Sequence, residues 1–408
     1  MRRTRSTVIA ISVLTGAGIF FTQVQSDLSR VYQAPWKESN LGNFEVVPSQ
    51  APSSTKLAST YPPPSTGPST LDHVADLLPS SIPERQPSST HEPPLFQAEF
   101  PFQNDLSLEV PVRTLSSLAT ANPHNYSPDG PRTYTYATFM ATQNPSLKDP
   151  YYLAIHSLIY RVLWSPHSRT SKYPFVVFVA DFVTLEQRQL LAGAGAIVRE
   201  LSALEWNPNV PGIQHRWRDL FAKLNMWNET EFERIIFLDA DAFPLTNIDA
   251  MFDIAPVQKC VQEKLHPDDY LADGTPVCEP YIFAGVPQNP FDTSRVNINV
   301  GSMVFTPSKR MHQRLLQNYV KTDRYDCLMA EQAFLNWQFD SQGAFPPTLL
   351  EREWGGFFPK QDEEGKLKVV HEKLWVEKDG WMKKEWEFIW QEMWMFYNGD
   401  DFRRIRTG

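Results

Sequence analysis

The sequence has little cysteine, no excess of positive charge and no internal repeat. Its three cysteines, Cys260, Cys278 and Cys327, form an odd set, so at least one thiol has no disulfide partner within the chain. The 38 lysines and arginines are outnumbered by 47 aspartates and glutamates, which gives a formal net charge of −9. A protein that binds nucleic acid by neutralising phosphates needs the opposite balance. We therefore expect no nucleic-acid partner.

The N-terminus also has only a short apolar run. Three arginines among the first five residues precede a run from about Val8 to Phe21. An extension to Val24 only just reaches the roughly 17–25 residues of a membrane-spanning helix. Because arginines favour a cytoplasmic N-terminus, we interpret 1–6 as a cytoplasmic tail and 7–24 as a signal-anchor helix. A signal peptide cleaved just after the run is the alternative. Either form directs the rest of the chain into the secretory lumen.

The stretch that follows is rich in proline, serine and threonine. Half of the 34 prolines precede residue 132. Such a composition cannot bury enough apolar surface to offset the entropy lost on ordering. We predict a disordered or extended stem over 25–131 and one large globular domain over 132–408.

From residue 133 onward, strand-like segments alternate with segments of helical spacing. The expected strands are 133–142, 174–180, 196–200, 234–238 and 300–306, and the expected helices are 151–164, 184–194, 216–227, 247–252, 308–319 and 330–339. This alternation predicts an α/β fold with a mostly parallel central sheet flanked by helices.

Two further features belong to this domain. Residues 255–293 form an irregular insertion, in which Cys260 and Cys278 either make a disulfide in an oxidising lumen or remain thiols. Near the C-terminus, three tryptophans at helical spacing are interpreted as core packing rather than as a sugar-binding platform. They are Trp386, Trp390 and Trp394.

Two N-glycosylation sequons are compatible with a lumenal domain. One is Asn228-Glu229-Thr230, and the other begins at Asn125. The second is the poorer acceptor, since Pro128 follows its serine.

The strand that ends in Asp239-Ala240-Asp241 carries the clearest chemical signal. An apolar run precedes the two acids, and Pro244 beyond them cannot continue a central strand. Both carboxylates therefore fall where a strand leaves an α/β sheet, the usual ligand-binding edge. Two hard oxygen donors suit a divalent cation that also binds phosphate oxygens. We expect a metal site for the diphosphate of a nucleotide-sugar; a simple turn with one capping acid would explain only one of the two.

Phosphatases of the haloacid dehalogenase type offer an alternative interpretation of the same motif. They carry it at the start of their domain, with threonine or valine two positions after the second acid. Here Phe243 occupies that position, and about a hundred residues of α/β pattern precede the motif. The phosphatase alternative therefore fits the sequence less well.

In several ordered segments the chain resembles glycosyltransferase family 8, the glycogenin-like group, from Thr133 to about Trp375. The segments are Ala141-Thr142-Gln143, Phe221–Trp227 with Lys223, Asp239-Ala240-Asp241 followed by Asn247–Phe252, Asn299-Val300-Gly301, Glu331-Gln332 with Asn336, and Val370–Trp375 with His371. Uncharacterised fungal members are the most alike. The resemblance implies that 132–408 is a catalytic domain of the GT-A fold.

The resemblance also implies a UDP-sugar donor, a Mn²⁺ or Mg²⁺ cofactor and a set of site residues. The implied metal ligands are Asp239, Asp241 and His371. The implied donor-binding residues are Thr142, Gln143, Asn299, Gly301, Lys373 and Asp239, and the implied catalytic residues are Gln332, Glu331 and Lys223. The cation would offset the negative charge that grows on the leaving diphosphate, and the lysines would add fixed positive charge.

Members of the family retain the anomeric configuration of the sugar. Retention by double displacement needs a carboxylate nucleophile near the anomeric carbon. Gln332, implied to lie there, is a poor nucleophile. We therefore favour front-face attack, in which the leaving phosphate helps to deprotonate the acceptor.

The sequence departs from the family pattern in three places. Glu331 replaces the usual aspartate, the segment after His371 lacks a Gly-x-x-Lys-Pro-Trp arrangement, and the insertion at 255–293 is longer than in glycogenin-like relatives. The second departure puts the role of Lys373 in question.

The expected anchor and stem differ from a cytosolic self-glucosylating protein. They suggest a single-pass type II protein of the Golgi membrane that acts on a lumenal glycan, glycoprotein or glycolipid. A catalytically inactive glycan- or nucleotide-binding protein on the same fold is the alternative from another class. It predicts decayed metal ligands, and all three ligands are present.

Overall fold

The computed structural model describes residues 96–130, 132–289 and 296–408. The predicted cytoplasmic tail, signal-anchor and most of the predicted stem lie outside these residues. Among the helices within them, none is both long enough and apolar enough to cross a membrane.

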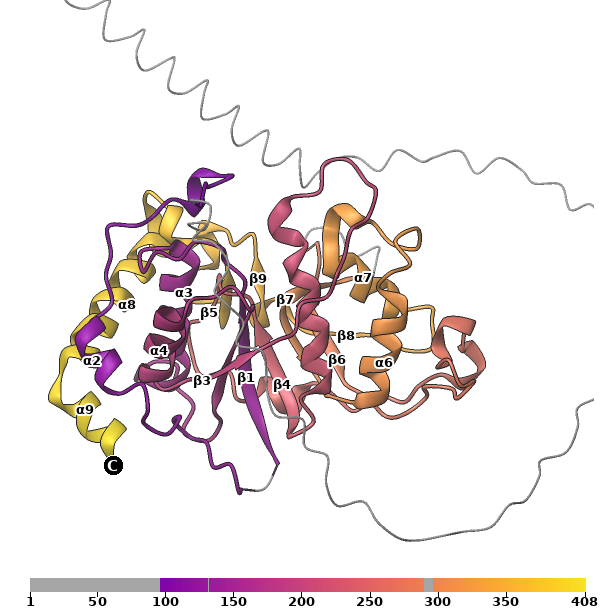
Figure 1. The fold of residues 1–408 in the computed structure, drawn as a ribbon, viewed down its shortest axis with the longest axis horizontal. Helices are drawn as coiled ribbons and strands as arrows, with labels where there is room; N and C mark the ends of the chain where they lie inside the picture. The colour runs from indigo at the N-terminus through magenta and orange to yellow at the C-terminus, as the bar shows by residue number, and fades with distance from the viewer. Residues whose placement is uncertain (1–95, 131, 290–295) are drawn as a thin grey trace, which may run out of the picture. The chain divides into compact units, whose positions relative to one another are not determined.

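A seven-stranded sheet forms the centre of the domain, in the order β3-β2-β1-β4-β7-β6-β8 (Figure 1). The strands are β1 (Thr133–Met140), β2 (Phe175–Val179), β3 (Ile197–Glu200), β4 (Phe232–Leu238), β6 (Phe283–Pro287), β7 (Ile298–Phe305) and β8 (Thr348–Leu349). Strands β3, β2, β1 and β4 are parallel, and β7 runs antiparallel to both of its neighbours. Nearly continuous apolar runs such as Phe175–Val179 are fully buried, because helices cover both faces of the sheet. The predicted mostly parallel α/β sheet is confirmed.

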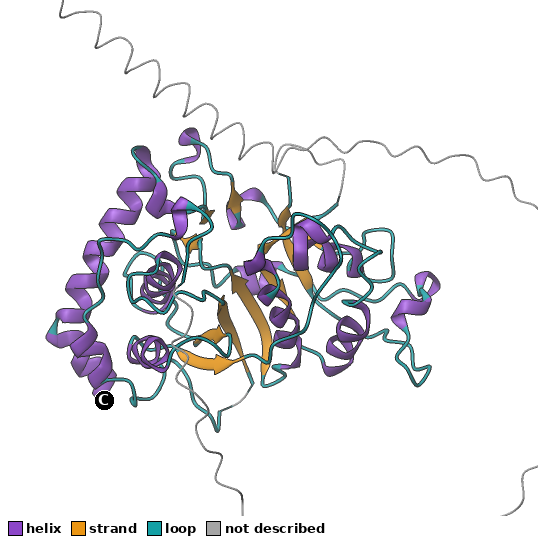
Figure 2. Ribbon diagram, turned by 45° about the horizontal axis from the view of Figure 1, so that its top comes forward, coloured by secondary structure: helices purple, strands orange, loops and turns teal. Residues whose placement is uncertain are grey.

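Helices lie on either side of these strands (Figure 2). They include α3 (Pro150–Leu163), α4 (Leu185–Gly193), α5 (Met251–Ile254), α6 (Lys309–Asn318) and α7 (Ala330–Gln338). The predicted capping box of α4 is present, since Thr184 and Gln187 bond reciprocally at its N-terminus. One expected helix differs in type: 216–227 is wound as two 3-10 segments, η2 (His215–Trp217) and η3 (Asp219–Asn228).

A second, three-stranded sheet in the order β5-β10-β9 adjoins the end of β4. Its strands are β5 (Ala242–Pro244), β9 (Gly356–Phe357) and β10 (Val369–His371). Strand β5 begins directly after Asp241 and pairs antiparallel with β10, so that Ala242 lies opposite His371. This pairing brings β10, which lies far along the chain, beside the two acids. Arg161 of α3 also bonds to this sheet: it donates to Pro244 O of β5 at 3.1 Å and to Glu385 Oε1 of the C-terminal part at 2.6 Å.

The predicted stem is wrong for residues 96–130, which pack against the domain. This segment contains η1 (Pro101–Gln103) and α2 (Val112–Ser117), and α2 contacts both α4 and the C-terminal α8 (Gly380–Asn398) (Figure 1). Leu115 is fully buried, and its carbonyl lies so close to Gly193 that a Cβ there would come within 2.0 Å. A few apolar side chains at short intervals are enough to attach the segment, although its proline content is typical of disorder.

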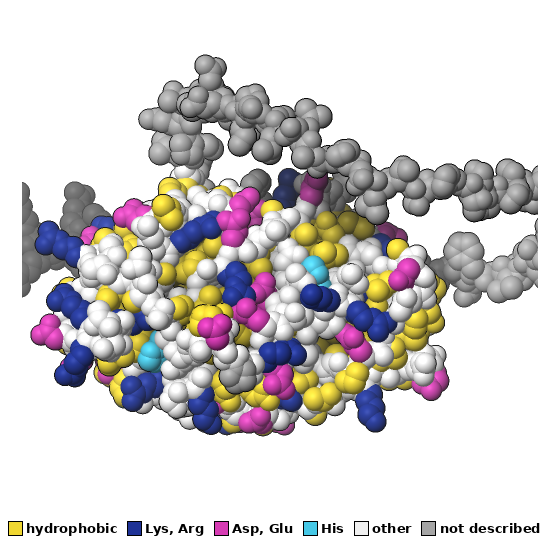
Figure 3. All heavy atoms as spheres, turned by 60° about the horizontal axis from the view of Figure 1, so that its bottom comes forward, with side chains coloured by type: hydrophobic (Ala, Val, Ile, Leu, Met, Phe, Trp, Pro, Cys, Tyr) yellow, Lys and Arg dark blue, Asp and Glu magenta, His cyan; other side chains and the backbone are white. Residues whose placement is uncertain are grey.

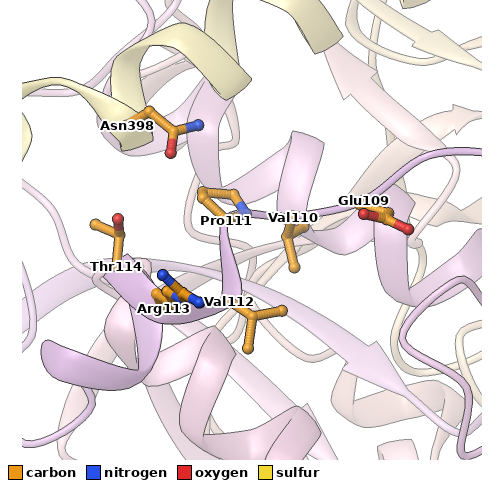
Figure 4. A pocket seen from close by; sticks show the side chains of 7 residues that line it. All are labelled: Glu109, Val110, Pro111, Val112, Arg113, Thr114 and Asn398. Carbon is orange, nitrogen blue, oxygen red and sulfur yellow. The ribbon is translucent and has the colours of Figure 1, made fainter.

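A shallow hollow lies where this segment meets the end of α8 (Figure 4). It is lined by Glu109, Val110, Pro111, Val112, Arg113, Thr114 and Asn398. None of these residues belongs to the predicted site.

The C-terminal part consists of α8 and α9 (Asp400–Thr407). Trp386 and Trp390 are buried, as expected for packing, whereas Trp394 is 48% exposed. In the insertion, Cys260 and Cys278 form a disulfide, and Cys327 is a buried free thiol. On the face shown in Figure 3, basic and acidic side chains are interspersed.

Candidate active site

The three predicted metal ligands come together at the end of β4. Asp239 and Asp241 follow that strand, and His371 ends β10. His371 Nε2 lies 3.3 Å from Asp241 Oδ1 and 3.9 Å from Asp239 Oδ2. The candidate ligand atoms of all three residues lie within 4.8 Å of one another. Two carboxylate oxygens and an imidazole nitrogen can hold one divalent cation at this spacing.

Gly301 of β7 leaves the room that this arrangement needs. A Cβ at this position would lie 2.2 Å from His371 Cε1 and 2.6 Å from Asp239 Oδ2. The backbone of Gly301 also fixes the first acid, because Asp239 N donates to Gly301 O at 2.8 Å. The residues therefore fit a divalent cation both in their donor atoms and in the space around them.

Each carboxylate of the cluster is paired with a lysine. Lys223 Nζ lies 2.9 Å from Asp239 Oδ1 and 2.8 Å from Glu331 Oε1. Lys373 Nζ lies 2.9 Å from Asp241 Oδ2. Burial alone would lower the pKa of each lysine, but the adjacent carboxylates raise both pKa values above the ordinary range. Both lysines are fixed positive charges at neutral pH.

The same contacts set the charge of Asp241 and His371. Burial would raise the pKa of Asp241, yet Lys373 and His371 hold it well below its ordinary value. Burial would lower the pKa of His371, but the hydrogen bond and charge of Asp241 raise it. Asp241 is therefore ionised and ready to bind a cation.

The corner between β7 and α7 holds the other implied donor residues. Asn299 Oδ1 accepts from Gly301 N at 2.9 Å, and Gln332 Oε1 accepts from Val300 N at 3.2 Å. Just before Glu331, Ala330 adopts φ 46° and ψ −133°, a conformation that L-residues rarely take. Strain of this kind is found at functional sites, where the surrounding structure imposes it.

Thr142 and Gln143 lie on the loop after β1, apart from the acids. Parallel β1 and β4 end at the same sheet edge, but Thr142 Oγ1 donates to Asp149 Oδ2 at 3.1 Å and Gln143 Nε2 to Asp219 Oδ2 at 3.0 Å. Burial raises the pKa of Asp149 to about 7, although its bonds from Tyr152 and Thr142 lower it. The side-chain bonds of these two residues go to Asp149 and Asp219 rather than to the metal ligands.

An aromatic and cationic cluster beside Lys373 was not predicted from the sequence. It consists of Phe102, Tyr151, Arg216 and Trp375. Burial, the largest effect, raises the pKa of Tyr151 to about 12, while Lys373 lowers it and Asp241 raises it. Phe102 falls within the predicted stem, whose proline-rich composition is typical of disorder. The pair of phenylalanines at 100 and 102, close to a helix-starting proline, was the available signal.

This sheet order, with a carboxylate pair and a histidine at the end of β4, agrees with the GT-A glycosyltransferase fold that the family resemblance implies. The resemblance to glycosyltransferase family 8 is confirmed by the relatives that the chain matches. Galactinol synthase 4 of Arabidopsis thaliana is 31% identical over 214 residues, which cover 49% of this chain and 62% of the relative. Galactinol synthase 1 of Solanum lycopersicum is 30% identical, with the same coverage.

An uncharacterised protein of Schizosaccharomyces pombe is 27% identical over 284 residues, covering 60% of this chain and 74% of its own length. Fungal relatives were expected, and this one matches. No family model matches the chain. Among solved structures, the glycosyltransferase GlyE of Streptococcus pneumoniae aligns with 65% of this chain and 63% of its own at 14% identity, with a TM-score of 0.39. So low a score carries no argument.

Proposed function

We propose that this protein is a retaining, metal-dependent glycosyltransferase that moves a sugar from a UDP-sugar to a hydroxyl group of a lumenal glycan, glycoprotein or glycolipid. The observation that supports it best is the cluster of Asp239, Asp241 and His371, with a lysine on each carboxylate. A decayed site on the same fold would not keep all three ligands and both lysines.

Asp239, Asp241 and His371 would hold Mn²⁺ or Mg²⁺, which supplies Lewis-acid stabilisation of the leaving diphosphate. Lys373 adds a fixed positive charge on the Asp241 side of the cluster, and Lys223 adds one on the Asp239 side. Burial of Lys223, which is 4% exposed, strengthens this effect because water screens it little.

Gln332 is the residue of α7 that would lie near the anomeric carbon. Its Oε1 accepts from Val300 N, and its amide NH₂ group is the part that would donate to the sugar. An amide cannot serve as the nucleophile of a double displacement. We propose front-face attack, with the departing phosphate oxygen taking the acceptor's proton.

Calorimetry with UDP, with and without Mn²⁺, tests the proposal first. We expect UDP binding that depends on the cation, and its loss in Asp241→Ala. Asp253→Ala in α5 is the matched control, because Asp253 is exposed and belongs to a different part of the fold. UDP binding that does not depend on Mn²⁺, or that persists in Asp241→Ala, contradicts the metal assignment.

A donor screen then tests turnover. It covers UDP-glucose, -galactose, -N-acetylglucosamine, -xylose and -glucuronate, and the relatives named galactinol synthase make UDP-galactose the first to try. Hydrolysis or transfer from one of them supports an enzyme. Cation-dependent UDP binding without turnover of any of them supports the inactive binding protein instead. The phosphatase alternative predicts phosphate release from a phosphomonoester, which the same samples can be tested for.

We also propose a lumenal catalytic domain in a single-pass type II protein of the Golgi membrane. The Cys260–Cys278 disulfide is consistent with an oxidising compartment. Protease protection of the full chain in sealed Golgi vesicles is the test. Digestion of residues 96–408 without detergent contradicts this location.

A further inference from the structure

The ring of Phe102 packs against the lysine of the metal cluster, although the sequence places Phe102 well before the predicted catalytic domain. Lys373 Nζ lies 5.3 Å from the centroid of this ring. On its other contact the same ammonium lies 2.9 Å from Asp241 Oδ2. An ammonium over an aromatic ring is attracted by the ring's electron-rich face, more strongly where water is excluded. The side chain of Lys373 is only 24% exposed.

The backbone of the same residue fixes the segment that follows Lys373. Trp375 Nε1 donates to Phe102 O at 3.1 Å. Trp375 belongs to η9 (Leu374–Val376), which begins directly after Lys373. Phe102 therefore contacts the ammonium of Lys373 with its ring and bonds the nearby Trp375 with its carbonyl.

Neighbouring aromatic rings hold Phe102 itself in place. Tyr151 of α3 meets Phe102 edge to face at 6.4 Å and Trp375 at 5.3 Å. Phe100 stacks on Phe102 at 5.3 Å. The guanidinium of Arg216 lies 5.5 Å from the Phe102 ring centroid, so a second cation borders the ring. In such a packed set, the lysine has far less freedom to move than an exposed lysine on a loop.

We propose that Phe102 is a positioning residue of the donor site: it holds the ammonium of Lys373 beside Asp241, where that charge meets the diphosphate of the donor. The inference rests on the proposed function, since it assigns Lys373 to the donor. It also means that the domain competent to bind donor begins before residue 102, not at residue 132.

Calorimetry of the Mn²⁺–UDP complex with the full chain tests the proposal. Partners that orient a ligand typically change affinity by about 10–100-fold. We expect Phe102→Leu, which keeps an apolar side chain but removes the ring, to weaken UDP binding by about tenfold or more in the presence of Mn²⁺. Phe102→Tyr keeps the ring and should bind like the wild type. Lys373→Met should weaken binding as well, and Phe102→Leu should add little to it, because both act through one ammonium.

A control separates positioning from folding. Leu115→Ala removes a fully buried side chain from the same N-terminal segment, far along the chain from Lys373. It should lower the melting temperature but leave the affinity for UDP unchanged. Equal affinity of Phe102→Leu and wild type, or additive losses from Phe102→Leu and Lys373→Met, would overturn the proposal. A wild-type protein that shows no Mn²⁺-dependent UDP binding contradicts the proposed function itself, which is a separate outcome.

Discussion

Lys223 lies 2.9 Å from Asp239, the first carboxylate of the metal cluster, and bridges it to Glu331 at 2.8 Å. Lys373 lies 2.9 Å from Asp241, the second carboxylate of the cluster. Three carboxylates and two ammonium groups leave about one negative charge in the site when His371 is neutral. A divalent cation changes that sign, which suits the negatively charged diphosphate of a donor. The lysines thus make the site receptive to an anion only together with a cation.

Gly301→Ala should abolish cation-dependent UDP binding. The added Cβ would meet His371 Cε1 at 2.2 Å and Asp239 Oδ2 at 2.6 Å, so both ligands must move. Since changes around a metal ligand already cost about 10–100-fold in affinity, we expect a loss above 100-fold, measured by calorimetry. Gly343→Ala, whose Cβ would meet no atom closer than 3.3 Å, is the control. Normal binding in Gly301→Ala would show that the cation lies elsewhere.

Ala330→Gly should stabilise the fold. Relief of the φ 46°, ψ −133° conformation recovers about 1–3 kcal/mol, against an entropic cost of about 0.4–1 kcal/mol for the added glycine. We expect a net gain of about 1 kcal/mol in the free energy of unfolding, measured in urea. Ala333→Gly, in the interior of the same helix, should instead lose about 1 kcal/mol. Destabilisation by both changes would mean that Ala330 carries no strain.

The affinity for Mn²⁺ should rise with pH around and above the ordinary pKa of histidine. Burial lowers the pKa of His371, but Asp241 raises it further, so the folded value lies above 6.5. A proton on the imidazole competes with the cation, so cation binding releases it. Without a cation, folding stability has the opposite pH dependence. The raised pKa of His371 contributes stability that is fully present below pH 6.5 and is lost as pH rises through the pKa of the folded state.

Calorimetry in buffers of different ionisation enthalpy checks both statements, because it counts the protons released. Release should approach one proton at pH 6 and decline towards pH 9. His312 has its pKa lowered by burial and serves as an internal control: His312→Gln should not change the proton count. A count independent of pH would exclude His371 as a ligand.

Asn228 should carry an N-linked glycan when the full chain is made in a eukaryotic secretory pathway, and Asn125 should not. Asn228 is exposed at the end of η3. The amide of Asn125 donates to Tyr173 O at 3.3 Å and Thr170 O at 3.5 Å, and Pro128 follows its sequon. Asn228→Gln should remove the endoglycosidase-sensitive shift in gel mobility, while Asn125→Gln should leave it. An unshifted wild-type chain would count against a lumenal domain.

The sequence predicted strands β1, β2, β3, β4 and β7 and most of the helices between them, because a buried strand is a continuous apolar run. It was wrong for β6, which lies within the segment expected to be an irregular insertion, and it missed the two-residue β8. It also predicted which side chains meet at the end of β4, through the family resemblance rather than through spacing. The small sheet of β5, β9 and β10 was missed, since strands of two or three residues have no readable period. The pairing of Lys223 with Glu331 was missed as well, because it joins residues 108 positions apart.

The boundary at residue 132 failed for a different reason. Composition averages over a long window, whereas Leu115 and Phe102 attach their segment through a few contacts. The 3-10 winding of η3 was not readable either, because apolar spacing there is compatible with both helix types. At the boundary, tertiary contacts decided what the local pattern left open.

The bond between Lys373 and Asp241 closes a separation of 132 positions. During synthesis the acids of β4 emerge long before the histidine and lysine that complete them. About a third of the chain is therefore made while the cation site is incomplete, and a premature stop between β8 and β10 leaves all seven strands of the central sheet without its chemistry. Loss of a short C-terminal piece is as complete a defect as loss of the motif itself.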